Sequence, residues 1–153
     1  MTAAACEVWF YQLERTGLEQ VLPELLEKTM ARGWRAQVRA PARDRIDQLD
    51  AWLWAWREDS FLAHGADDEP MADRQPVLLT TGAENLNDAQ ALFLVDGAEP
   101  GDLSPFERCI VIFDGREEAA LTQARNRWKT FKAGGSPVTY WRQAEGKGWE
   151  RQG

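Results

Sequence analysis

The chain has 153 residues, a length typical of one domain, and 44% of them are apolar. It has no run of the roughly 20 apolar residues that span a bilayer, and its first residues do not have the pattern of a signal peptide, so we expect a cytoplasmic protein without a membrane partner. The net charge of −7 repels polyanions, which predicts no direct binding to DNA.

The first half of the chain alternates predicted strands and helices. Residues 7–11 are β-branched and aromatic, which favours a buried strand. Apolar residues at three- and four-residue steps then predict a helix over 18–30, with Gly33 as its C-cap. Residues 34–40 alternate apolar and polar side chains, which is typical of a half-buried second strand.

A second helix is expected to open near Pro41, followed by a long loop at about 57–75. Polar, acidic, Gly and Pro residues fill that loop, and loops of this length in compact domains tend to be functional or disordered. The stripe that we expect the helix to bury consists of Ile46, Leu49, Trp52, Leu53 and Trp56.

The second half of the chain predicts further strands and one more helix. Residues 76–80, 91–95 and 109–113 are continuous apolar runs of the kind found in central strands. A last helix over 117–133 and a strand over 138–141 follow. This order predicts an α/β fold, with an open, mostly parallel sheet, helices on both faces and a Rossmann-like topology, in one domain spanning residues 1–153.

Sheets of this kind often bind nucleotides, but this sequence lacks the motifs of a nucleotide site. The turn after the first strand, residues 12–17, holds one glycine where a phosphate-binding loop needs several, and no P-loop motif is present. Cys6 and Cys109 lie in strand-like runs, where thiols behave as buried apolar groups, and no CxxC pair exists. We therefore expect no cofactor, metal or disulfide. The alternative is a degenerate nucleotide- or S-adenosylmethionine-dependent enzyme acting through Ser60 and His64.

The last helix carries the most informative pattern. Its spacing sets Arg125, Lys129 and Lys132 in a stripe beside the core stripe, with Trp128 at the edge between them. Basic side chains beside an aromatic edge suit an apolar peptide that ends in a carboxylate. A purely structural role also remains open, because cations near a helix C-terminus stabilise its dipole. Trp54 leaves the stripe of its own helix, so it either faces outward as an interface anchor or completes the core as the chain turns back.

Four segments of the chain have distinctive sequences: Phe-Tyr-Gln-Leu at 10–13, Leu-Asp-Ala-Trp-Leu-Trp at 49–54, Asp-Ser-Phe-Leu-Ala-His-Gly at 59–65 and Ala-Arg-Asn-Arg-Trp-Lys at 124–129. Together they resemble a known family, the chi subunit of bacterial DNA polymerase III holoenzyme. The resemblance covers nearly the whole chain, and its middle segments are the most specific.

The resemblance implies a non-catalytic accessory subunit of the replicative polymerase on a sheet that binds no nucleotide. It implies that Arg125, Trp128 and Lys129, with Lys132 as a weaker candidate, bind the acidic C-terminal tail of single-stranded DNA-binding protein. Trp128 stands where many relatives carry Tyr, and Leu121 replaces a basic residue, which predicts weaker contacts to the acidic part of the tail.

A second surface implied by the resemblance would bind the psi subunit of the clamp loader or a repair helicase. It involves Trp54, Phe61 and His64. The chain would then act as a monomer or in a heterodimer within the replisome, and it would reach DNA only through the protein that coats single strands.

Overall fold

The computed structural model describes residues 6–55, 64–66, 72–144 and 148–152. Its elements in chain order are β1 (Glu7–Leu13), α1 (Leu18–Ala31), β2 (Ala36–Arg39), α2 (Arg43–Ala55), β3 (His64–Ala66), the 3-10 turn η1 (Ala72–Arg74), β4 (Val77–Thr80), β5 (Ala91–Leu94), β6 (Arg108–Asp114), α3 (Glu118–Ala133), β7 (Val138–Gln143) and β8 (Trp149–Arg151).

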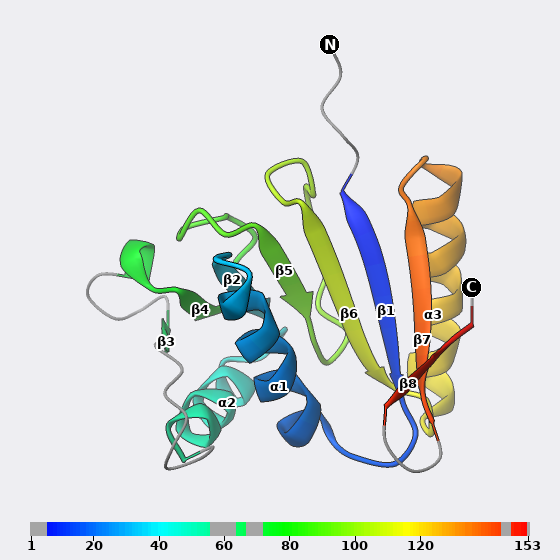
Figure 1. Ribbon diagram of the computed structural model, residues 1–153, viewed down its shortest axis with the longest axis horizontal. Helices are drawn as coiled ribbons and strands as arrows, with labels where there is room; N and C mark the ends of the chain where they lie inside the picture. Colours follow the sequence, from blue (N-terminus) through cyan, green and yellow to red (C-terminus); the bar gives the residue numbers. More distant parts are fainter. Residues whose placement is uncertain (1–5, 56–63, 67–71, 145–147, 153) are drawn as a thin grey trace.

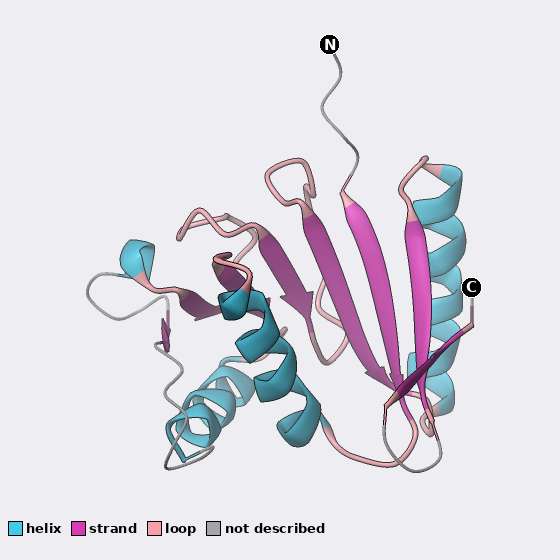
Figure 2. Ribbon diagram, viewed as in Figure 1, coloured by secondary structure: helices cyan, strands magenta, loops and turns pink. Residues whose placement is uncertain are grey.

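The described strands form one open sheet in the order β3-β4-β2-β5-β6-β1-β7-β8 (Figure 1). All neighbouring strands are parallel except β8, which runs antiparallel to β7. Helices α1 and α2 lie on one face and α3 lies on the other (Figure 2). The predicted α/β fold, with its open and mostly parallel sheet, is confirmed.

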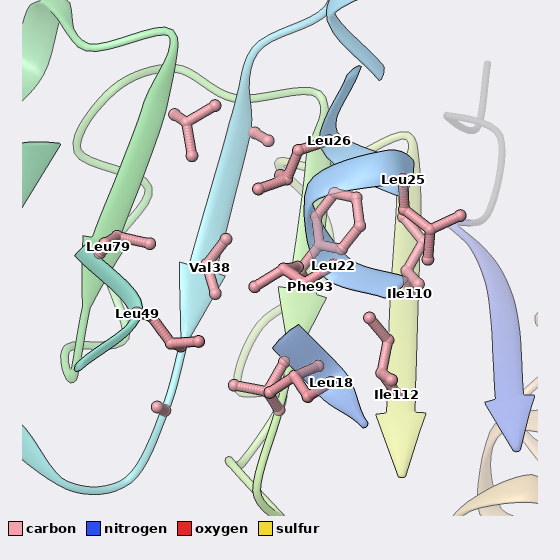
Figure 3. Close-up of a cluster of buried hydrophobic side chains, with 14 of the residues drawn as sticks. Leu18, Leu22, Leu25, Leu26, Val38, Leu49, Leu79, Phe93, Ile110 and Ile112 are labelled. Carbon is pink, nitrogen blue, oxygen red and sulfur yellow. The ribbon is translucent and has the colours of Figure 1, made fainter. Parts of the chain in front are cut away.

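The face under α1 and α2 holds the larger apolar core. The leucines of α1 point down onto Phe93 of β5 and onto Ile110 and Ile112 of β6 (Figure 3). Leu22 and Leu26 are 1% and 0% exposed. Burying each such side chain contributes roughly 1.5–3 kcal/mol, so this face fixes α1 on the sheet.

Helix α1 ends at the predicted glycine, although the C-cap residue itself is Arg32 and Gly33 directly follows it. Gly33 adopts φ +82°, in the left-handed region that glycine occupies without strain. The amide of Gly33 donates to the carbonyl of Met30 at 2.9 Å, and the amide of Trp34 donates to that of Thr29 at 3.3 Å. This pattern is a Schellman motif, which ends the helix and satisfies its last carbonyl groups.

The prediction that β2 is half-buried is wrong, because all four of its residues are buried. On its second face, Arg39 donates from Nη2 to the carbonyl of Ala83 at 2.9 Å and from Nη1 to that of Pro100 at 3.0 Å, and its Nε donates to Oε1 of Gln37 at 2.7 Å. Loops following β4 and β5 thus close over polar side chains and supply their acceptors. Polar character in β2 therefore marks a hydrogen-bonded interior and not a surface.

The predicted buried stripe of α2 is confirmed for three of its members but not for Trp52. Ile46, Leu49 and Leu53 are buried, whereas Trp52 is 38% exposed. Its ring N–H donates to the carbonyl of Glu19 at 2.5 Å, so the side chain leans onto the start of α1 and not into the core. Trp56 lies outside the described residues.

Two short strands were not predicted. β3 lies inside the stretch predicted as one long loop and pairs with β4 through three residues. β8 pairs with the end of β7. Each has three residues, too few to give a recognisable period in the sequence.

Candidate functional site

Helix α3 is the most basic element of an otherwise acidic chain. Between residues 119 and 133 it carries four basic residues and no acidic one. Gly135, at φ +88°, closes its C-terminus, where the amide of Ser136 donates to the carbonyl of Phe131 at 3.1 Å. The helix packs on β6 and β7, with Ala124 buried at 2% exposure and Trp128 half-buried.

A pocket of about 320 Å³ lies between α3 and the β7–β8 hairpin. Three of the side chains that the sequence predicted as a site line it together: Arg125, Trp128 and Lys129. Tyr140 of β7 and Gln152, which follows β8, complete the lining. The two basic side chains are exposed, whereas both aromatic rings are half-buried. The pocket thus combines a fixed aromatic wall with cations that remain accessible to a ligand.

Aromatic packing fixes the wall of this pocket. The rings of Trp128 and Tyr140 meet edge to face, with centroids 5.6 Å apart. Phe10 of β1 lies beneath both, stacked on Tyr140 at 5.9 Å and tilted against Trp128 at 6.0 Å. Such ring pairs contribute about 0.5–1.5 kcal/mol beyond the area that they bury. The wall is therefore ordered before any ligand binds.

The Tyr140 hydroxyl belongs to a chain of hydrogen bonds. It donates to Oε1 of Gln12, and the Gln12 amide donates to Glu14. Burial raises the pKa of Tyr140, and the positive charge of Arg125 acts in the opposite direction without cancelling this effect. The hydroxyl therefore stays neutral near pH 7 and serves to position the ring.

Lys132 lies beside the pocket and not among its lining residues. Its Nζ is 5.5 Å from the centre of the Trp128 ring, within the range of a cation–π contact. Leu121 is half-buried and lies outside the lining as well. Lys132 can thus add positive charge next to the pocket, whereas Leu121 adds none.

Sequence reasoning missed Tyr140 and Gln152. The residues around Tyr140 were predicted as a strand, but only the parallel register that pairs Tyr140 with Phe10 brings its ring to α3. Gln152 directly follows the unpredicted strand β8, and its backbone amide donates to the Tyr140 carbonyl at 2.7 Å. The sequence feature that could have indicated this residue was the aromatic character of Tyr140 itself.

The second predicted surface, formed by Trp54, Phe61 and His64, lies only partly within the described residues. Phe61 and Ser60 lie outside the described residues, and so does the side chain of Trp54 in α2. His64 is not the loop residue that its polar neighbours suggested, because it lies in β3 with its side chain fully buried. Its Nε2 is 3.2 Å from the Oδ1 atom and 3.2 Å from the carbonyl oxygen of Asp50, so it ties β3 to α2. Its place in the surface for a second partner stays a prediction.

A larger cavity, of about 640 Å³, lies at the carboxyl ends of β1 and β6, where α1 and α3 leave toward opposite faces. Folds of this kind place nucleotides at such a point. Here the two arginines that line it are paired with carboxylates: Arg45 with Asp96 at 2.8 Å, and Arg116 with Asp114 at 2.8 Å. Glu117 adds further negative charge. This lining disfavours phosphate groups.

The described residues contain no group of three or more His, Cys, Asp or Glu side chains arranged to hold a metal ion. No described helix is long and apolar enough to cross a membrane.

Comparison with protein families identifies the chain. Residues 6–139 match the family model described as DNA polymerase III chi subunit, HolC. The chain belongs to this chi family. No curated protein matches it. Within the chi family match lie Arg125, Trp128 and Lys129, whereas Tyr140 and Gln152 follow its end. The pocket thus combines a helix inside the family region with two hairpin residues that follow the end of the match.

Proposed function

We propose that this chi-family chain binds the acidic C-terminal tail of single-stranded DNA-binding protein in the pocket between α3 and the β7–β8 hairpin. In the same proposal it links that protein to the psi subunit of the clamp loader or to a repair helicase, and it works in the cytoplasm without catalysis. The observation that carries the proposal is that Arg125, Trp128 and Lys129, identified on the sequence, line one pocket.

The chemistry of the pocket supports a peptide that ends in an apolar residue. Arg125 and Lys129 are exposed on the same face of α3, one turn apart, where they can bind a terminal carboxylate and the acidic residues before it. Trp128 and Tyr140 offer the tail's last side chain an aromatic wall. A tail that ends in Pro-Phe would bury its ring there.

The free energy required is within reach of these contacts. Micromolar affinity corresponds to about −8 kcal/mol. A charge-assisted hydrogen bond contributes roughly 1.5–3 kcal/mol, and burial of a phenyl ring contributes a similar amount. Two cations and one apolar contact would supply most of the total, while the remaining acidic residues add attraction that salt weakens.

Calorimetry with three matched peptides tests the proposal. The first is an acidic peptide ending in Pro-Phe, the second has the same sequence with a C-terminal amide, and the third replaces Phe with Ala. We expect the first to bind in the micromolar range and the other two at least tenfold more weakly. Equal binding of all three would show that the pocket recognises neither the carboxylate nor the ring.

The link to a second partner rests on the family resemblance at Trp54, Phe61 and His64. A Phe61→Ala protein should bind the tail peptide normally and lose capture of psi or of the helicase. An Arg125→Ala protein should show the reverse. Loss of both interactions in either variant would indicate misfolding, which circular dichroism would detect.

A further inference from the structure

A second surface that combines basic and aromatic side chains lies on the opposite face of the sheet from α3. Residues of β1 alternate between the two faces: Phe10 packs under α3, while Trp9 points to the face of α1. On that face α1 covers the part of the sheet around β5, and no described helix lies over β1 and β7 (Figure 1). Trp9 is consequently only half-buried.

Guanidinium groups and indole rings alternate across this surface. The guanidinium carbon of Arg32 lies 4.1 Å from the centre of the Trp34 ring. The guanidinium carbon of Arg108 lies 5.2 Å from the centre of the same ring and 3.9 Å from the centre of the Trp9 ring. We call Arg32, Trp34, Arg108 and Trp9 the Arg/Trp stack. Arg32 is exposed, and the two rings are half-buried. The stack therefore offers both planar groups and positive charge to solvent.

This surface keeps positive charge beyond the ion pair that Arg108 forms. Arg108 pairs with Glu7 at 3.2 Å, whereas Lys28 and Arg32 are exposed one turn apart at the end of α1. Both line the same shallow hollow as Trp9 and Trp34, of about 100 Å³. A cavity that encloses benzene measures about 150 Å³, so this hollow admits the edge of a ring and not a whole one. A planar ligand would lie on the stack.

We propose that the Arg/Trp stack, with Lys28, is a contact surface for single-stranded nucleic acid. Planar bases stack on indole rings and on guanidinium planes, and phosphates bind Arg and Lys side chains, so a strand matches both components of the surface. The hollow of about 100 Å³ is too small to enclose the phenyl ring of an acidic peptide that ends in Phe, so such a peptide would match mainly the charges. The proposal departs from the expectation drawn from net charge, because that charge is an average and these cations are clustered. It does not depend on tail binding, whose pocket lies on the other face.

Fluorescence anisotropy with a labelled oligothymidylate of about 20 nucleotides tests this surface on the full chain. We expect saturable binding that weakens with salt, with a log–log slope of about −2, since each of three phosphate contacts contributes about −0.7 for single strands. Lys28→Gln with Arg32→Gln should weaken binding at least tenfold and bring the slope to about −0.7. Arg32→Lys should weaken binding at an unchanged slope, because it keeps the charge and loses the planar group.

The matched control removes two charges from the peptide pocket. Arg125→Gln with Lys129→Gln should leave oligonucleotide binding within twofold, and excess peptide ending in Pro-Phe should not displace the oligonucleotide. The proposal is overturned by any of three results: no binding at low salt, equal weakening by both double variants, or preferential binding of the acidic peptide to the Lys28 and Arg32 surface. All four substituted side chains are exposed, so the variants should fold normally.

Discussion

Removal of the Arg125 guanidinium is the most direct perturbation of the pocket that we propose binds the peptide. The side chain is exposed at the pocket edge, and it packs on one side toward Tyr140, whose pKa responds to its charge. A charge-assisted hydrogen bond contributes roughly 1.5–3 kcal/mol, whereas a fully exposed ion pair contributes about 0.2–1 kcal/mol. Since Arg125 is an exposed cation beside a half-buried aromatic wall, we expect Arg125→Ala to weaken the binding free energy of the peptide by about 1–2 kcal/mol.

That loss corresponds to roughly a 5- to 30-fold increase in the Kd of the acidic peptide, measured by calorimetry at low salt. The effect should shrink as ionic strength rises, because added salt screens the remaining attraction between pocket and peptide. Thermal unfolding should change little, since Arg125 is exposed and surface substitutions of this kind usually shift stability by less than about 0.5 kcal/mol.

The matched control is Arg127→Ala, which removes the same charge from the same helix. Arg127 points elsewhere: its Nη2 donates to the carbonyl of Gly97 at 3.2 Å and lies 3.7 Å from Glu99. We expect peptide affinity within about twofold of the unchanged protein. If both variants weaken binding equally, the peptide responds to the overall charge of α3 and the pocket assignment is refuted.

Three further predictions concern stability. Trp128→Ala should lower the free energy of unfolding by about 2 kcal/mol, about half of what a fully buried Trp costs, and lower Tm by about 4–8 °C, while Trp128→Phe should lose much less. Gln143 accepts hydrogen bonds through Oε1 from the backbone amides of residues 14, 15 and 16 at 3.0, 2.7 and 3.1 Å. Gln143→Ala should therefore lower the free energy of unfolding in urea by about 1–3 kcal/mol and speed hydrogen exchange at those amides. Unchanged exchange would contradict this role. Burial raises the pKa of Tyr11 to about 12 from 10.0, so the unfolded chain releases this proton at lower pH than the folded protein does. The free energy of unfolding should therefore fall by about 2 kcal/mol between pH 10 and pH 12. Urea unfolding at the two pH values should show a smaller loss in Tyr11→Phe.

Local patterns in the sequence were enough to place most of the elements and to find the helix that carries the site. The period of α1 and α3, the apolar runs of β4, β5 and β6, and the glycine after α1 depend on neighbours within a few residues, so they can be read directly from the chain. The same holds for Arg125, Trp128 and Lys129, because residues three and four apart share a helix face.

Tertiary structure decided which distant segments meet. Tyr140 reaches the pocket because β7 pairs with β1, and strand order depends on contacts between residues far apart in the chain. Burial of Arg39 and His64 likewise depends on acceptors that other segments supply, from the loops after β4 and β5 and from α2. A polar side chain has the same identity in the sequence whether it is solvated or hydrogen-bonded inside the protein. The sequence therefore determined which residues could bind a peptide, and only the folded sheet determined which of them line one pocket.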